Sequence, residues 1–172
     1  ERSGILIGIL LSSVILAQLG VQYSAVTSVP VIHNISTDTV EPPVFNKLVA
    51  IREAEGANPL AYDAEVLAEQ QQTAYPEVKT LISSQPTKIL FNQAMIVLQD
   101  LGLEIVNEDR AAGMIEATAT TFWFGFKDDV VLRIRPTANG SIVDVRSVSR
   151  VGQSDLGANA KRIRAILRGI EG

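Results

Sequence analysis

Cysteine is absent from the 172-residue chain, and histidine occurs only once, as His33. Without cysteine the protein forms no disulfide, binds no metal through sulfur and has no thiol nucleophile. A Ser-His-Asp arrangement would have to use His33, and we expect this residue instead to fix its own segment through hydrogen bonds from the ring. A hydrolase built on His33 and a carboxylate therefore ranks behind the functions considered below.

The sequence also lacks the short motifs by which many enzymes are recognised. It has no phosphate-binding P-loop, no G-x-G-x-x-G, no G-x-S-x-G and no H-E-x-x-H. We therefore expect a protein that is not an enzyme and that holds no cofactor and no metal. With 15 basic against 19 acidic residues and a net charge of -4, we expect no nucleic-acid partner either.

Charge is missing from one long stretch, since no residue from Ser3 to Ile32 is charged. This run makes the mean hydropathy positive, at +0.21, although 20% of all residues are charged. As a helix, residues 4–26 are long enough to cross about 30 Å of hydrocarbon. A cleavable signal peptide would have a shorter apolar core and more positive charge ahead of it. We therefore predict a transmembrane anchor over residues 1–26, which makes one membrane crossing within these 172 residues.

The residues around this anchor suggest its orientation and a partner. Arg2 precedes it, whereas no lysine or arginine follows until Lys47, so we expect the rest of the chain on the periplasmic or lumenal side. Gly4, Gly8 and Ser12 recur every four residues and would let another helix pack closely in the membrane. Glycine and serine are also common in transmembrane helices that have no such partner.

Two further parts are predicted after the anchor. Residues 27–62 include Pro30, Pro42 and Pro43 and have no sustained periodicity, which predicts an extended segment that wraps the domain or a partner. Residues 63–172 predict an α+β domain. Its expected helices are 63–75, 87–101 and one starting near 154, and its expected strands are 103–108, 114–121, 130–135 and 141–150. The simplest arrangement is a four-stranded antiparallel sheet with two helices packed on one face.

A tight hairpin is predicted where Asn139 and Gly140 separate the last two strands. If these two residues form the turn, Arg133 lies directly opposite Arg146 on the face that points away from the helices. Like charges in direct opposition are unfavourable on a sheet, so we expect a negative group between them.

Three sources could supply this negative charge: Glu116 of the neighbouring strand, Asp38 of the extended segment, or an external anion. The first two would make the charged residues structural, whereas the third would make them a binding site. The predicted ligand-binding or structural polar network consists of His33, Asp38, Glu116, Asp129, Arg133, Asp144, Arg146 and Arg150.

Four of the nine aromatic residues fall in one short run, as Phe122, Trp123, Phe124 and Phe126. We expect two of these rings to lie in the core. For the other two rings, a protein interface and contact with lipid both stay open.

Several segments taken together are similar to one known family, the domain of unknown function 1499. They are residues 29–38 with Pro42 and Pro43, 75–76, 115–117, 122–129 and 144–159. The resemblance extends over nearly all of residues 29–170. It implies a bacterial or plastid protein with membrane helices ahead of the domain, and it implies no particular activity. The family pattern leads us to expect aspartate at position 34, and Asn34 in this chain argues against a role there that needs charge.

These observations favour a non-catalytic, membrane-anchored accessory subunit that docks onto a larger membrane complex, with a bioenergetic complex as one candidate. The evidence for it is the apolar anchor, its small-residue face and the missing catalytic motifs. The alternative is an extracytoplasmic module that binds an anionic lipid or metabolite through Arg133, Arg146 and Arg150.

Overall fold

The computed structural model describes residues 12–18 and 29–172. The chain divides into two compact units, Glu1–Pro30 and Val31–Gly172. In the first unit, residues 12–18 are helical, and the predicted transmembrane helix otherwise lies outside the described residues, Gly4 and Gly8 included. Among the described residues, no helix has both the length and the apolar character needed to span a membrane.

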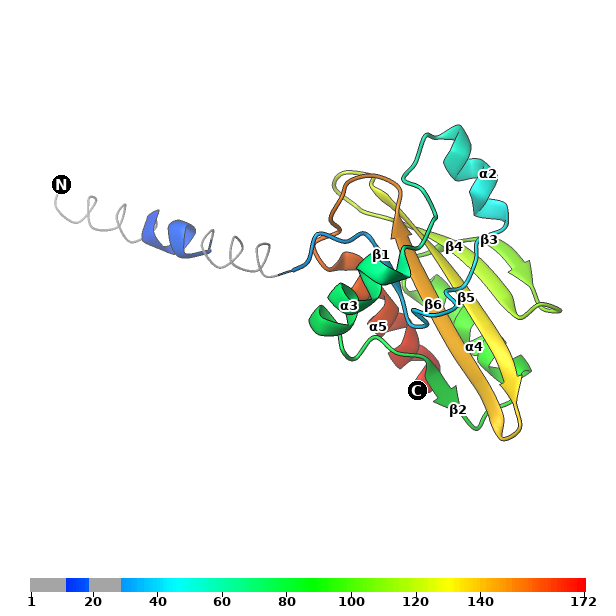
Figure 1. The fold of residues 1–172 in the computed structure, drawn as a ribbon. Coiled ribbons are helices and arrows are strands. Elements are labelled where there is room, and N and C mark those ends of the chain that lie inside the picture. Colours follow the sequence, from blue (N-terminus) through cyan, green and yellow to red (C-terminus); the bar gives the residue numbers. More distant parts are fainter. Residues whose placement is uncertain (1–11, 19–28) are drawn as a thin grey trace, which may run out of the picture. The chain divides into compact units, whose positions relative to one another are not determined.

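The second unit combines one antiparallel sheet with four helices among its described residues (Figure 1). In chain order its elements are β1 (Asn34–Ser36), α2 (Lys47–Ala54), α3 (Ala64–Ala74), β2 (Leu81–Ser83), α4 (Thr87–Asp100), β3 (Glu104–Asp109), β4 (Met114–Thr120), β5 (Lys127–Thr137), β6 (Gly140–Ser149) and α5 (Ala158–Glu171). The predicted α+β class and the antiparallel sheet are confirmed, but six strands replace the predicted four.

The four predicted strands correspond to β3, β4, β5 and β6, which pair consecutively. The two additional strands both lie along the outer edge of β6. β1 pairs with its Arg146–Val148 part and β2 with its Ser141–Val143 part. Each has only three residues, which is too short to give a recognisable alternation of polar and apolar side chains.

The helices begin and end at residues with clear local causes. The Asp63 side chain accepts a hydrogen bond from the Val66 amide and caps α3. α4 ends just before Gly102, whose φ of +75° suits the left-handed turn that follows a helix. α5 begins at Ala158, later than predicted, although the Asp155 carboxylate still accepts from the amides of Gly157 and Asn159.

The predicted register of the β5–β6 hairpin is wrong by two residues. The turn residues are Ala138 and Asn139, with Thr137 paired to Gly140. Gly140 is required for a different reason: a Cβ there would lie 2.1 Å from the Ser83 carbonyl oxygen of β2. Gly140 is therefore needed for the close approach of β2 and not for the turn. The Asn139-Gly140 pair predicted the wrong turn for this reason. A shift of two residues leaves every side chain on its predicted face.

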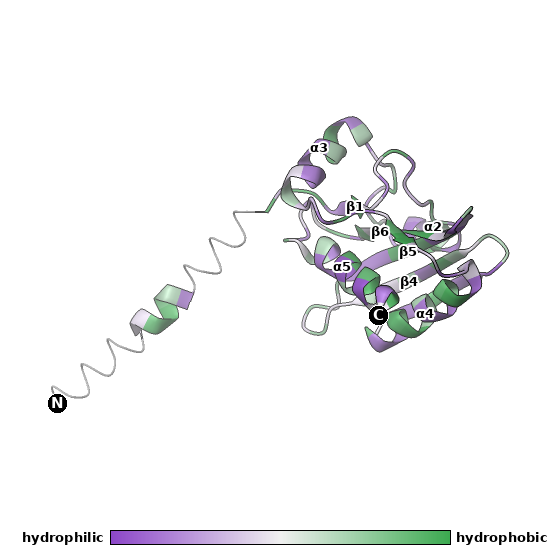
Figure 2. Cartoon of the chain, turned by 90° about the horizontal axis from the view of Figure 1, so that it is seen from below, coloured by the Kyte–Doolittle hydropathy of each residue, from purple (hydrophilic) through white to green (hydrophobic). Residues whose placement is uncertain are grey.

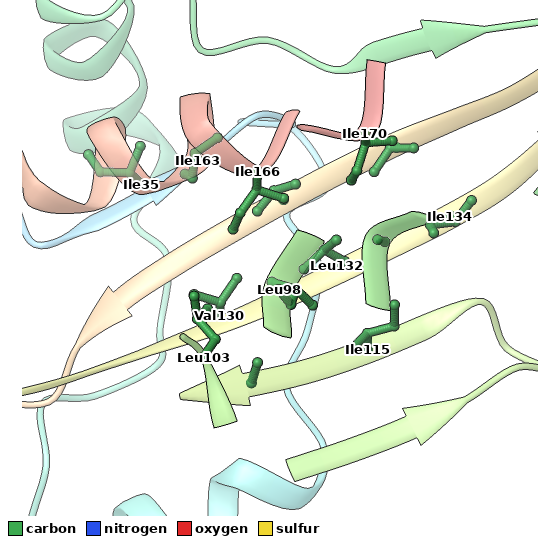
Figure 3. Close-up of a cluster of buried hydrophobic side chains, with 14 of the residues drawn as sticks. Ile35, Leu98, Leu103, Ile115, Val130, Leu132, Ile134, Ile163, Ile166 and Ile170 are labelled. Atoms are coloured by element: carbon green, nitrogen blue, oxygen red, sulfur yellow. The ribbon is translucent and has the colours of Figure 1, made fainter. Parts of the chain in front are cut away.

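The main core lies between the sheet and the helices α4 and α5, which run side by side across one face (Figure 2). Figure 3 shows Ile163, Ile166 and Ile170 of α5 in the same buried cluster as Leu132 of β5. All four side chains are at most 1% exposed. Complete burial of each contributes about 1.5–3 kcal/mol to folding. The helices therefore pack on this face of the sheet mainly through apolar contacts, as its alternating pattern predicted, and Asn159 of α5 adds buried hydrogen bonds to Ser147 and Ser149 of β6.

Gly113 and Gly102 give a matched test of how closely β4 and β5 must approach. Both have a positive φ, +68° and +75°, but a Cβ on Gly113 would lie 2.2 Å from the Ile134 carbonyl oxygen, whereas one on Gly102 meets nothing within 4 Å. We expect Gly102→Ala to cost about 1–2 kcal/mol for the left-handed backbone. Gly113→Ala should cost about 1–3 kcal/mol more because the strands must separate.

Urea unfolding of the full chain in mild detergent, followed by circular dichroism, measures both losses. Equal losses for the two variants would contradict the close contact between Gly113 and Ile134.

Candidate functional site

The face of the sheet opposite α4 and α5 is rich in charged residues and is largely covered. We call it the charged face, and it consists of Glu116, Thr118, Asp129, Arg133, Asp144, Arg146 and Arg150. Residues 37–63, here called the covering segment, cross this face and include α2. A small apolar cluster of Phe45, Leu48, Val131 and Val148 packs between them. The sequence predicted which residues share this face, but it did not predict α2.

Asp129 is the centre of the charged face and is 0% exposed. Its Oδ2 accepts from Arg52 Nη1 at 2.6 Å and from Arg150 Nε at 2.8 Å. Its Oδ1 accepts from Thr118 Oγ1 at 2.7 Å and from Arg150 Nη2 at 2.8 Å. Arg150 thus binds this carboxylate through two parallel hydrogen bonds, the strongest arrangement for such a pair. One carboxylate joins α2, β4, β5 and the end of β6.

A second group forms around Asp144, which is also 0% exposed. It accepts from Arg133 at 3.2 Å and Arg135 at 3.0 Å, and its other oxygen accepts from the hydroxyls of Thr37 and Thr80. Arg133 also pairs with Asp38 of the covering segment at 3.0 Å. Of the three predicted sources of negative charge, Asp38 is the one that lies beside Arg133. The predicted opposition of Arg133 and Arg146 is wrong, because Arg133 is paired with Asp144.

Among the described residues Glu116 forms no ion pair with Arg133 or Arg146, and instead it holds the start of α2. Its two oxygens accept from the backbone amides of Asn46, Lys47 and Leu48 at 2.7–3.3 Å, and from the Asn107 side chain at 2.9 Å. A carboxylate at this position satisfies amides that have no partner within the helix and interacts favourably with the helix dipole. The N-terminal cap of α2 is therefore a side chain of β4, which lies 68 to 70 residues further along the chain.

Arg146 is 3% exposed and has no carboxylate partner among the ion pairs of the described residues. Its guanidinium donates to the Asn34 side chain and to the carbonyl oxygens of Pro43 and Leu60. It also lies 5.5 Å from the ring centre of Phe45 and 5.6 Å from that of Tyr62. Hydrogen bonds to carbonyl groups and contact with two aromatic rings therefore replace a negative partner.

The pKa values follow from these partners. Burial raises the pKa of Asp129, but hydrogen bonds from Arg150, Thr118 and Arg52 lower it by more, so that it lies below its ordinary value of 3.8. The hydrogen bond to Asp129 in turn raises the pKa of Arg150. Burial lowers the pKa of Arg146 to about 10, the direction expected for a cation without a carboxylate beside it.

His33 lies apart from the charged face. Its Nδ1 is 3.3 Å from the carbonyl oxygen of Gln153, in the connection between β6 and α5. Its own carbonyl oxygen accepts from the amide of Ser149 and from the side chain of Asn159. The backbone of His33 therefore joins the start of the domain to β6 and α5, and its ring is not near the buried carboxylates.

Sequence reasoning missed three residues that hold the covering segment and its surroundings. Arg52 of α2 pairs with Asp129, and Glu55 pairs with Arg150 at 2.6 Å. Gln71 of α3 is fully buried; its side-chain amide both accepts from the amide of Ser36 and donates to its carbonyl. The one available signal was Arg52 placed a helical turn after Leu48 on the same face, and eight residues are too few to establish it.

The connection between β4 and β5, residues 121–126, is called the aromatic loop. Two of its four rings were predicted to lie in the core, and this prediction is wrong: Phe122, Trp123, Phe124 and Phe126 are 89%, 84%, 77% and 52% exposed. Thr121 and Phe126 are joined by a backbone hydrogen bond of 2.9 Å, which closes the loop beyond the end of the sheet. The rings contact each other in two pairs, at 5.2 Å and 5.5 Å.

One hollow of about 450 Å³ adjoins the charged face, at the start of α2. Its lining includes Phe45, Met114 and Glu116. Glu116 is 1% exposed and already accepts four hydrogen bonds, so it has no free site for a ligand. None of the arginines of the charged face lines this hollow.

Comparison with known proteins gives one matching family and partial likenesses to solved structures. A family model described as a protein of unknown function (DUF1499) matches residues 34–170, which confirms the resemblance seen in the motifs. No curated protein matches the chain. A solved structure described as "Crystal structure of Ara h 8.0201" is 16% identical, covers 55% of this chain and 93% of that chain, and has a TM-score of 0.42. At that score the likeness carries no argument.

Asp129→Asn should cost about 3–5 kcal/mol of unfolding free energy at neutral pH, because it leaves the buried Arg52 without a carboxylate and the buried Arg150 with only the half-exposed Glu55. The folded-state pKa of Asp129 lies below its ordinary value. The stabilisation is therefore complete above about pH 4 and is lost as the pH falls through the lowered folded-state pKa. We expect the difference between the wild type and this variant to narrow over that acidic range. Urea unfolding of the full chain in mild detergent at a series of pH values measures it.

Glu41→Gln is the matched control, since the Glu41 side chain is 72% exposed and pairs with Arg135 at 3.2 Å. It should cost less than about 1 kcal/mol. Similar losses for the two variants, or a difference that stays constant with pH, would show that Asp129 is not the centre of the charged face.

Proposed function

The chain belongs to the DUF1499 family of proteins of unknown function, and we propose that it acts as a non-catalytic, membrane-anchored accessory subunit that docks onto a larger membrane complex. We propose a bioenergetic complex as one candidate for this partner. The domain over residues 31–172 would lie on the periplasmic or lumenal side.

The observation that carries the non-catalytic part of this proposal is the way three buried carboxylates are used. Asp129, Asp144 and Glu116 are at most 1% exposed, and each accepts four hydrogen bonds from the protein itself. Four is about the full capacity of a carboxylate. A general acid or base must reach the proton that it transfers, and these groups face only internal donors.

The membrane part of the proposal is supported by the first unit. Residues 12–18 are helical, and Val14, Ile15 and Leu16 are 61%, 60% and 68% exposed. Three consecutive exposed apolar side chains on a helix are typical of a surface that contacts lipid or another protein. The uncharged run from Ser3 to Ile32 extends this character in both directions. A bilayer or the helices of a membrane partner would provide that environment.

The second candidate is a module that binds an anionic lipid or metabolite, and the observation that favours it is Arg146. This arginine is buried without a carboxylate partner, so a bound anion would stabilise its positive charge. Its donors, however, already meet Asn34, Pro43 and Leu60, and Arg133 and Arg150 are paired with aspartates. The accessory subunit is therefore the function that the geometry supports best.

Extraction of native membranes in mild detergent, followed by mass spectrometry of everything that migrates with this chain, tests the two candidates. We expect a stoichiometric membrane protein partner. A strictly monomeric chain carrying no partner would contradict the accessory role, and a monomer that carries an anionic molecule would favour the second candidate.

Two matched variants locate the docking contact. On a continuous helix, Gly8 shares a face with Gly4 and Ser12, whereas Ala17 lies about two and a half turns further along, on the opposite face. Gly8→Leu should release the partner because it fills the small-residue face, and Ala17→Leu should retain it. Loss of the partner in both variants, or in neither, would contradict docking through this face.

A further inference from the structure

The aromatic loop is the most apolar exposed feature of the domain, and none of the contacts described above uses it. Its four rings are 52–89% exposed and are arranged as one edge-to-face pair and one stacked pair. Gly125 has a φ of +64° and donates its amide to the Thr121 carbonyl oxygen at 3.0 Å. The loop is therefore a closed, hydrogen-bonded turn that holds its rings outward.

Other exposed apolar side chains lie at the same end of the sheet. The amide of Arg150 donates to the carbonyl oxygen of Lys127 at 2.9 Å, which joins the base of the aromatic loop to the connection between β6 and α5. That connection carries Val151 and Leu156, 54% and 57% exposed. Figure 1 shows both connections at the end of the sheet where the chain enters the domain.

The chain enters the domain at this same end. The amide of Asp155 donates to the Ile32 carbonyl oxygen at 3.3 Å, and the preceding Val31 is 68% exposed. Residue 31 begins the second unit, so the uncharged run of residues 3–32 leads directly to it along the chain. The exposed aromatic rings are thus at the end of the domain that covalently adjoins the apolar segment.

The charges of this end also suit a lipid surface. No acidic residue lies between Glu116 and Asp128, so the aromatic loop itself is uncharged. Asp128 pairs with Arg162 at 2.6 Å and Glu55 with Arg150, which neutralises the carboxylates nearest the aromatic loop. Asp155, beside Leu156, accepts hydrogen bonds from the amides of Gly157 and Asn159. Lys127 lies at the base of the loop with its side chain 44% exposed, and its Nζ is 4.0 Å from the Glu55 carboxylate. Tryptophan and phenylalanine next to lysine form a combination found at membrane interfaces.

We propose that the aromatic loop, together with Val31, Val151 and Leu156, inserts into the interfacial region of the bilayer that holds the anchor. This inference rests on the membrane anchoring proposed above. Two points of attachment, the anchor and the loop, would fix the orientation of the domain against the membrane surface. A groove in a partner protein is the rival occupant, and it would need a shape that matches the outward-facing rings, whereas lipid adapts to them.

Trp123 is the only tryptophan in the chain, so its fluorescence reports on this loop alone. The full chain is reconstituted into phosphatidylcholine vesicles with ordinary or with brominated acyl chains, and flotation records whether it is incorporated. We expect Trp123 to lose most of its emission in the brominated vesicles. Trp123 should also resist quenching by iodide.

The possible failures can be told apart. If the chain floats with the vesicles but Trp123 escapes the brominated lipid and is quenched by iodide, the loop does not insert, while the anchoring stands. Protection that occurs only in native membranes, and not in pure lipid, would also overturn the inference and point to a protein occupant. If the chain does not float, the anchoring fails and the inference fails with it.

Two variants separate insertion by the loop from general proximity to the membrane. Phe122→Ser together with Phe124→Ser should leave Trp123 open to iodide and unquenched by brominated lipid. Ile82→Ser is the matched control, because Ile82 is 79% exposed and belongs to β2, at the other end of β6. It should behave as the wild type. Unchanged quenching in the double variant would overturn the inference.

Discussion

The fold depends on one constraint, which is that β5 and β6 are buried on both faces. Asp129, Val130, Val131 and Leu132 are consecutive and all 0% exposed. On one face apolar side chains meet α4 and α5. On the other, a buried carboxylate must find enough hydrogen-bond donors to replace water, and Asp129 finds them in Arg52, Arg150 and Thr118. The covering segment is needed because it supplies one of these arginines.

The same need for buried hydrogen-bond partners explains why α2 forms within residues 27–62, for which the sequence predicted an extended segment. Its eight residues are too few to be stable alone, and its preceding residue Asn46 makes no side-chain cap. Glu116 of β4 caps it from outside, and Arg52 ties its buried side to Asp129. Both stabilising groups are distant in sequence, so no local pattern reveals the helix. The prediction of an extended segment is wrong for residues 47–54, because tertiary contacts and not helix propensity decide their conformation.

Alternation along β5 and β6 was sufficient to assign their faces, and hydrophobic spacing was sufficient to predict α4 and α5. The exact pairing was not predictable, because Gly140 is explained by the approach of β2 rather than by the turn. The partner of Arg133 was not predictable either, because the sequence permits Glu116, Asp38 or an external anion. In the structure Arg133 pairs with Asp38 and Asp144. The four aromatic rings were placed in part in the core on hydrophobicity alone, yet they lie on a loop beyond the sheet, where hydrophobicity serves an interface instead.

The central claim is that the covering segment is a fixed part of the fold and not a movable cover over a charged site. Native-state hydrogen exchange of the full chain in mild detergent, over a series of low urea concentrations, tests it most directly. If the claim holds, the amides of α2 exchange only in the same global opening as those of β5, with the same urea dependence. If α2 opens in a separate step of lower free energy while β5 stays protected, the buried carboxylates become accessible in the folded domain, and the claim is contradicted.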